Sequence, residues 1–155
     1  YSSNAEDALN IVNSFLISNR LTIKKTRSDA LDLDYSDAYI SDFSSDNTGG
    51  DGIDLSRSCV IITGSEFSNA SDKGISVGEL TYCRVDSCVF RNNKHGIANK
   101  DQSLLNISNS TFIKNNNSIS EFIKKPCFGR PHMNSNNITY TDNKNKYSWK
   151  GYNPY

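Results

Sequence analysis

A repeat with a period of 22 residues constrains this chain more strongly than any other feature of its sequence. A small residue followed by an aliphatic residue recurs at this interval, at Ala8-Leu9, Ala30-Leu31, Gly52-Ile53, Gly74-Ile75, Gly96-Ile97 and Ser118-Ile119. A unit of this length cannot enclose a hydrophobic core by itself, so neighbouring copies must stack on one another. The repeat therefore predicts a solenoid that occupies most of the chain.

Within the repeats, apolar and polar residues alternate, as in Leu9-x-Ile11, Ile53-x-Leu55 and Ile75-x-Val77. Alternation with a period of two is typical of strands, and clusters of Asn, Asp, Gly and Ser between the apolar runs are typical of turns. Stacked copies of such units form parallel ladders with a spacing of about 4.7–4.9 Å. We therefore predict an all-β fold, a single-stranded parallel β-helix of about six coils, over residues 1–142. A leucine-rich repeat has a similar period, but its leucine-dense frame is missing here.

The repeat breaks down after Ile119. Residues 121–134 contain two prolines and four basic side chains, which predicts a loop that protrudes from the sixth coil. Residues 143–155 are rich in aromatic residues and contain no aliphatic residue, which predicts a C-terminal tail that is either a lid over the last coil or a frayed end. At the other end, the first coil starts within a few residues of Tyr1, so we expect upstream coils or another domain of the same parent chain to cover it.

Charge and cysteine content exclude several classes of protein. The 17 basic and 17 acidic residues balance and no basic block is present, which argues against nucleic acid or an anionic membrane as the main partner. No run approaches the roughly 20 apolar residues of a membrane span, so membrane insertion is not expected. The cysteines show no zinc-binding spacing. Cys59 and Cys83 fall at similar places in adjacent repeats, and the sequence leaves open whether they form a disulfide or are small core residues. The remaining two are Cys88 and Cys127.

Aspartates recur in columns along the predicted stack. Asp7, Asp29 and Asp51 share one repeat position, and Asp32 and Asp54 share another. Carboxylates about 5 Å apart on neighbouring coils repel one another and raise each other's pKa unless something compensates. Three compensations remain open: N–H bonds at the corners, pairing with basic side chains, or a calcium ion held by several oxygens. The candidate calcium ligands are Asp29, Asp32, Asp51 and Asp54, and no other cofactor is indicated.

Three phrases resemble a known family: Asp51-Gly52-Ile53-x-Leu55, Lys73-Gly74-Ile75-x-Val77 and His95-Gly96-Ile97-x-Asn99. They are similar to the right-handed parallel β-helix repeats of the pectate-lyase-like superfamily, and especially to the NosD-like repeats of bacterial surface and periplasmic proteins. The resemblance covers roughly residues 5–120. It implies a right-handed coil and an extracellular, periplasmic or cell-surface location. It implies no single activity, because such repeats occur in lyases, hydrolases, epimerases, adhesins and phage spikes.

One enzyme subfamily supplies the candidate catalytic residues. Polygalacturonase-type hydrolases carry four polar motifs on consecutive coils. The matching places here read Asn47-Thr48 with Asp51, then Asp72-Lys73, then Lys94-His95-Gly96, then Asn117-Ser118-Ile119-Ser120. The order and spacing are similar, but Lys73 replaces one carboxylate, and the Arg/Lys pair that grips the substrate is absent. By this resemblance the candidate catalytic residues are Asp51, Asp54, Asp72 and His95.

We therefore expect a β-helix module of a larger extracellular or surface protein that is structural or binds a polysaccharide or protein partner, without its own catalytic activity. The alternative is a polysaccharide-active hydrolase or lyase that uses the four candidate catalytic residues. An open groove with converging carboxylates would favour the enzyme, whereas carboxylates bonded to corner amides would favour the binding module. Candidate aromatic stacking residues are Tyr39, Tyr82, Phe122 and Phe128.

Overall fold

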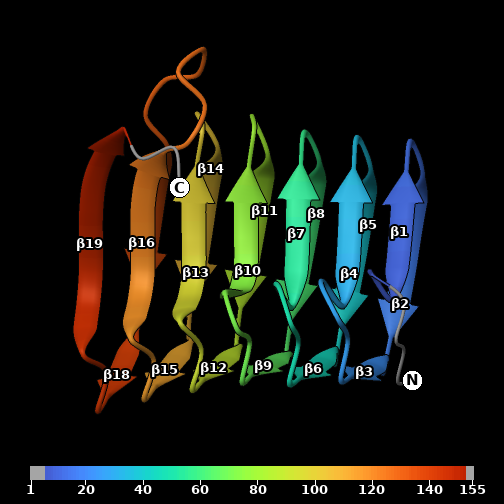
Figure 1. Ribbon diagram of the computed structural model, residues 1–155, viewed down its shortest axis with the longest axis horizontal. Coiled ribbons are helices and arrows are strands. Elements are labelled where there is room, and N and C mark those ends of the chain that lie inside the picture. Colours follow the sequence, from blue (N-terminus) through green and yellow to red (C-terminus); the bar gives the residue numbers. More distant parts are fainter. Residues whose placement is uncertain (1–5, 153–155) are drawn as a thin grey trace.

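The computed structural model describes residues 6–152 as a stack of short parallel strands (Figure 1). The strands form three sheets that run along the stack. The seven-stranded sheet contains β1 (Leu9–Val12), β4 (Leu31–Asp34), β7 (Ile53–Ser56), β10 (Lys73–Gly78), β13 (His95–Lys100), β16 (Asn117–Ile123) and β19 (Asn145–Tyr152). The second sheet contains β2 (Phe15–Asn19), β5 (Asp37–Ser41), β8 (Cys59–Thr63), β11 (Tyr82–Asp86), β14 (Leu104–Ser108) and β17 (His132–Asn136). The third sheet contains β3 (Thr22–Lys24), β6 (Ser44–Asp46), β9 (Glu66–Ser68), β12 (Val89–Arg91), β15 (Thr111–Ile113) and β18 (Thr139–Thr141).

One strand from each sheet makes up a coil, so the described residues form six coils and β19 begins a seventh. Every strand pair is parallel, and in the seven-stranded sheet the register places Leu31 beside Ile53 and Ile75 beside Ile97. The predicted all-β parallel β-helix of about six coils is therefore confirmed. No helix among residues 6–152 is long and apolar enough to cross a membrane.

The core consists of columns of inward-facing residues, one column for each position of the repeat. Aliphatic side chains from the first two sheets face one another, and aromatic rings from the third sheet stack along the axis. The Phe90 ring lies between those of Phe67 and Phe112, at centroid distances of 5.1 and 4.7 Å. Because all three rings are fully buried, the column removes a large apolar area from water.

Polar side chains close the corners between the sheets. At the corner before the seven-stranded sheet, Asn93, Asn115 and Asn143 form a ladder in which each amide nitrogen donates to the next side-chain oxygen, at 3.1 and 3.0 Å. The same oxygens accept the backbone N–H groups of Asn93 and Asn115. The ladder explains why asparagine recurs at this corner of the later coils. A serine ladder serves the corner after the seven-stranded sheet in the same way, with Ser36 N donating to Ser58 Oγ.

The second sheet contains one extra residue between the third and fourth coils, and a corner accommodates it. Where coil three has one residue with positive φ, Arg57, coil four has two, Glu79 and Leu80. The second sheet is therefore in register at a step of 23, with Cys59 beside Tyr82, although the seven-stranded sheet keeps a step of 22. The longer left-handed corner of coil four therefore accommodates the extra residue.

The same shift separates Cys59 from Cys83. Cys59 is exposed on the outer face of β8, whereas Cys83 is fully buried in β11. All four cysteines of the chain are free thiols, so the disulfide does not form; the core-residue interpretation is confirmed for Cys83 and is wrong for the exposed Cys59.

The predicted loop is shorter than 121–134. β16 continues through Ile123 with Glu121 and Phe122 buried, and β17 begins at His132, so residues 124–131 alone protrude (Figure 1). The loop is held at its base by the buried Asp101 carboxylate, which accepts the backbone N–H groups of Lys124 and Lys125. β16 pairs with β13 and β17 pairs with β14 of the preceding coil, which explains why both ends of the predicted loop are strands.

The expectation for the tail was wrong in the described residues. Residues 145–152 are neither a lid nor a frayed end, because β19 pairs in parallel with β16 and extends the seven-stranded sheet. Tyr147 lies beside Ile119 in this register and donates to Glu121 at 2.6 Å, which fixes the strand in place. Residues 1–5 and 153–155, including Tyr1 and Tyr155, lie outside the described part of the chain.

Candidate functional site

The outer face of the seven-stranded sheet gathers the polar residues that the sequence singled out. Three rows run along it from coil to coil. The first row contains Asp29, Asp51, Lys73, His95 and Asn117; the second Asn10, Asp32, Asp54, Ser76, Ala98 and Ser120; the third Asp34, Ser56, Gly78, Lys100 and Phe122. The charge of the face therefore changes along the axis, from acidic on the early coils to basic on the later ones.

The aspartate column is bonded to the corners. Asp51 N donates to Asp29 Oδ1 at 2.5 Å, and Lys73 N donates to Asp51 Oδ1 at 2.9 Å. Lys73 Nζ also lies 3.3 Å from Asp51 Oδ1. Two of the three compensations left open by the sequence are thus present together, namely corner N–H bonds and a basic partner.

Even so, the pKa of three carboxyl groups on this face is raised above its ordinary value. Burial raises the pKa of Asp51 to about 7, although the nearby Lys73 charge opposes the shift. Burial also raises the pKa of Asp32 to about 7, helped by the charges of Asp34 and Asp54. Burial likewise raises the pKa of Asp29. The acidic half of the face therefore carries less negative charge near neutral pH than its composition suggests.

These shifts predict a stability that falls as pH rises from about 4 to 7, between the ordinary and the folded pKa of Asp32 and Asp51. A folded-state pKa above the unfolded value means that the folded state holds more protons in this window, so raising the pH destabilises it. We expect a loss of roughly 1 kcal/mol each for Asp32 and Asp51 after solvent screening. His95 acts oppositely below its ordinary pKa of 6.5, because burial lowers its folded pKa to about 4. Denaturant unfolding at a series of pH values, in chelator, measures the net slope.

The Asp51→Asn variant is expected to flatten this pH dependence, and Asp46→Asn on the third sheet is the matched control. A slope that is unchanged in Asp51→Asn would contradict the assignment of the titration to this carboxyl.

Three carboxylates come close enough to share a cation. One oxygen each from Asp29, Asp51 and Asp54 lie within 4.8 Å of one another. Asp32, the fourth candidate calcium ligand, is not part of this group, and its Oδ2 accepts the Asn10 side-chain amide at 3.0 Å. Calcium takes 6–8 oxygen ligands at about 2.3–2.6 Å. The carboxylates supply part of such a set, and Lys73 Nζ competes with a cation at Asp51.

We expect the fold not to depend on calcium, because Asp29 and Asp51 already accept N–H bonds at their corners. The thermal midpoint should be the same with chelator and with millimolar Ca²⁺. Binding to the folded state alone would raise the midpoint. A rise that Asp54→Asn abolishes would therefore contradict this expectation and locate the ion at the three-carboxylate group.

Asp72 lies between two lysines. Its carboxylate is bonded to Lys73 Nζ and lies 3.2 Å from Lys94 Nζ. Although burial acts against it, these bonds lower the pKa of Asp72 to about 2. Asp72 is therefore a permanent anion at neutral pH.

His95 interacts with the later coils and not with the candidate carboxylates. Its Nδ1 lies 2.7 Å from Ser120 Oγ, which accepts a hydrogen bond from Ser148 Oγ at 3.0 Å. The Ser120 hydroxyl thus links the imidazole to β19. In the register of the sheet, Lys73 stands between Asp51 and His95. The structure thus brings Asp51 and Asp72 to Lys73, groups Asp54 with Asp51 and Asp29, and places His95 one coil further on.

Next to His95 the face is hollowed into a pocket of about 180 Å³. Its lining comes from four segments that are distant in the sequence, and it consists of Asp72, Lys73, Lys94, His95, Lys100, Phe122, Lys124 and Lys150. Sequence reasoning missed Lys100, Lys124 and Lys150. For Lys100 there was a signal: it follows Gly78 by 22 residues, and a glycine on the preceding coil leaves room for a long side chain to lie back across it.

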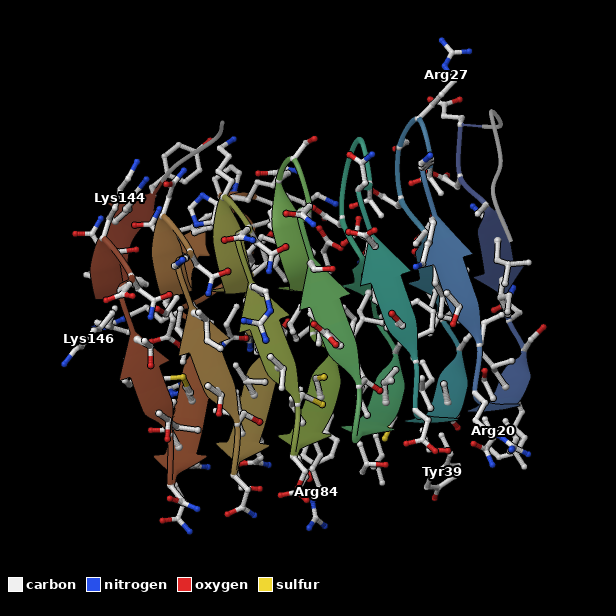
Figure 2. All side chains as sticks on the ribbon, turned by 90° about the horizontal axis from the view of Figure 1, so that it is seen from below. Arg20, Arg27, Tyr39, Arg84, Lys144 and Lys146 are labelled. Carbon is white, nitrogen blue, oxygen red and sulfur yellow. The ribbon has the colours of Figure 1, made fainter. Side chains whose placement is uncertain are left out.

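The candidate stacking aromatics do not form one surface. Tyr39 and Tyr82 are exposed on the second sheet, and Figure 2 shows Tyr39 pointing outward on the same side as Arg84. Phe122 is buried at the pocket on the seven-stranded sheet. Phe128 lies in the protruding loop, 5.9 Å from the Arg57 guanidinium. Only Phe122 therefore belongs to the pocket.

Comparison with known proteins agrees with this architecture. Residues 7–153 match the family described as a right-handed β-helix region. The match confirms the handedness implied by the resemblance and is consistent with the pectate-lyase-like superfamily. A search of curated proteins gave no match.

Proposed function

The chain belongs to the right-handed β-helix family, and from its fold and the chemistry of the seven-stranded sheet we propose that it is a polysaccharide-binding module without catalytic activity of its own. The module would be part of a larger extracellular, periplasmic or cell-surface protein. The location follows from the resemblance to surface and periplasmic repeats and is tested by fractionating cells that make the parent protein.

The pocket beside His95 is the observation that carries this proposal. It opens on a regular sheet face that extends along the whole stack, so an extended polymer has a surface on which to lie and a recess that fixes its register. Charged and aromatic side chains line the recess, with Phe122 supplying an apolar wall. Convergent polar groups in a recess are the usual features of a ligand site.

The state of the candidate catalytic residues supports binding over catalysis. Glycoside hydrolysis needs a carboxylic acid with a raised pKa that reaches the substrate. Asp72 has a pKa of about 2, and so it cannot supply a proton at neutral pH. Asp51 has a raised pKa, but it is 5% exposed and is held by Lys73 and the corner. His95 is neutral and bonded to Ser120.

A polysaccharide lyase or hydrolase is the second candidate. The proximity of Asp51 and Asp54 to Lys100 favours it, because both carboxylates act electrostatically on this buried lysine. If this candidate is correct, incubation with the bound polysaccharide releases reducing ends or unsaturated products, and Asp51→Asn abolishes them.

Affinity electrophoresis against neutral, uronate-containing and sulfated polysaccharides tests the binding proposal. We expect at least one polymer to bind without release of products. Lys124 and Lys150 are exposed at the pocket rim, so the variant with both changed to Ala should fold normally and bind at least fivefold more weakly. Arg84→Ala on the second sheet should bind like the parent chain. Absence of binding to every polymer, or a loss confined to Arg84→Ala, would overturn the proposal.

We also propose an intramolecular partner, namely another part of the parent chain that packs on the first coil. The first coil presents an apolar edge, in which Leu9 is 37% exposed and Ile11 and Leu16 are only partly buried against the core. Upstream coils or another domain packed on β1, β2 and β3 would cover these side chains and pair the open strand edges.

A further inference from the structure

We propose that the pocket binds a tetrahedral oxyanion, the sulfate or phosphate ester group of a polysaccharide, with Lys100 as its central ligand. The polysaccharide part of this inference rests on the proposed function, and the oxyanion part stands on the geometry of the pocket.

Lys100 carries the argument because it is buried without a partner. It is 4% exposed, lines the pocket, and makes no hydrogen bond or ion pair with any residue in the described range 6–152. Its Cε and Nζ lie against Gly78, where an added Cβ would stand 3.4 and 3.6 Å from them. The Asp54 and Asp51 carboxylates act on this ammonium group only through space and neither is bonded to it, so an anionic ligand in the pocket would complete its contacts.

The buried acidic side chains of the described residues all have polar partners. Glu79 lies 2.7 Å from Lys125 Nζ, and Glu121 accepts from Asn99 at 2.8 Å. Asp101 accepts two backbone N–H groups, and Asp51 is paired with Lys73. Lys100 is bonded to none of these four carboxylates, and burial lowers its pKa.

The surroundings of Lys100 are strongly cationic. Five lysines line the pocket against one aspartate, and that aspartate is already shared by Lys73 and Lys94. Lys124 and Lys150 reach the pocket from the loop and from β19, and neither side chain makes an ion pair with a described residue. Because the lysines approach from different elements, they surround a small volume and concentrate positive potential there.

The type of cation indicates the type of anion. A planar carboxylate is best held by the two parallel N–H groups of an arginine, and no arginine lines the pocket. Separate ammonium groups act as point charges that can each meet a different oxygen of a tetrahedral group. A phosphate monoester carries about −1.5 to −2 charges, which matches several lysines better than the single charge of a carboxylate does. The neutral His95 lines the same pocket and adds no negative charge that would repel the anion.

Calorimetric titration of the whole chain with dextran sulfate, unmodified dextran and polygalacturonate tests the inference, since these polymers differ in the group they present. We expect dextran sulfate to bind, dextran not to bind, and polygalacturonate to bind at least tenfold more weakly. Inorganic sulfate and inorganic phosphate should each compete, and the stronger competitor identifies the ester. Binding should weaken as salt rises.

Lys100→Met removes the charge and keeps the length of the side chain. It should lower the affinity for dextran sulfate at least tenfold, while Lys24→Met, exposed in β3 on the first coil, should change it less than twofold. Lys150→Met, which is exposed and cannot disturb the core, should lower it about threefold. If Lys100→Met does not fold, the affinity of Lys150→Met for dextran sulfate tests the inference instead.

The two proposals fail in different ways. Polygalacturonate that binds as tightly as dextran sulfate, or equal effects of Lys100→Met and Lys24→Met, would overturn the tetrahedral oxyanion and leave polysaccharide binding intact. If no polymer binds but inorganic sulfate still binds in a manner that depends on Lys100, the oxyanion site stands and the proposed function fails. If neither the polymers nor the free ions bind, both are overturned.

Discussion

Replacing Asn115 by Ala is expected to lower the free energy of unfolding by about 3–5 kcal/mol, since each buried group left unpaired costs about 1–3 kcal/mol. Asn115 is 1% exposed. Its oxygen accepts from the backbone and side chain of Asn93, and its nitrogen donates to Phe90 O at 2.9 Å and to Asn143. The variant would leave Asn93 N–H and Phe90 C=O without their partners inside the stack.

Thermal and denaturant unfolding measure this effect, and the midpoint should fall by roughly 10 °C for a chain of this size. Asn116→Ala is a matched control. Asn116 is the next residue in the sequence, but it is exposed, and the hydrogen bonds that it makes with described residues involve its backbone groups, which the substitution keeps. If Asn115→Ala and Asn116→Ala were equally stable, the ladder would contribute nothing to stability. The free energy of unfolding of Asn115→Asp should lie between those of Asn115→Ala and Asn116→Ala, because the carboxylate keeps the acceptor oxygen and loses the amide donor.

The fold could be predicted because every coil must satisfy the same constraints. Stacked coils share one geometry, so each inward position needs an apolar side chain and each corner needs a residue that tolerates positive φ or bonds the coil above. The periodic signal of Ile53, Ile75 and Ile97 follows directly from the first requirement. The Asn-rich corners at Asn93 and Asn115 follow from the second.

The site could be predicted only in part, because its parts do not follow the repeat. The aspartate column is periodic, and its place on the sheet followed from alternation. The pocket depends on β19 and on the loop after β16, which the repeat does not describe, so Lys150 and Lys124 could not be connected to His95. Lys100 was overlooked because a lysine at an outward position is normally solvated, and its burial depends on Gly78 and on the elements added over it.

The charge of the seven-stranded face also depends on these additions. Its early coils carry paired and partly protonated carboxyl groups, and its later coils carry lysines with few counter-charges. An anionic polymer lying along the stack would therefore be attracted to the later coils and repelled near the first ones, which gives the face a direction. The neutral net charge of the whole chain conceals this asymmetry.

Replacing Gly74 by Ala is expected to lower the free energy of unfolding by about 2–4 kcal/mol, near the upper end of the cost of overpacking a core. A Cβ at this position would stand 2.6 Å from Gly96 O and 2.9 Å from the Phe90 ring. The repeat itself indicates that the ring decides the outcome. Gly52, Gly74 and Gly96 each face a Phe of their own coil, whereas the coil of Ala30 has Ser45 in the place of that Phe.

Denaturant unfolding of Gly74→Ala, of Phe90→Leu and of the double variant measures the coupling between the two positions. We expect the double variant to be more stable than the sum of the single losses predicts, because Leu gives the added methyl group room. Gly129→Ala in the loop is the control, since its Cβ would meet only the Gln102 side chain at 3.6 Å. Strictly additive losses would show that the backbone of the next coil, and not the phenylalanine column, requires glycine at this corner.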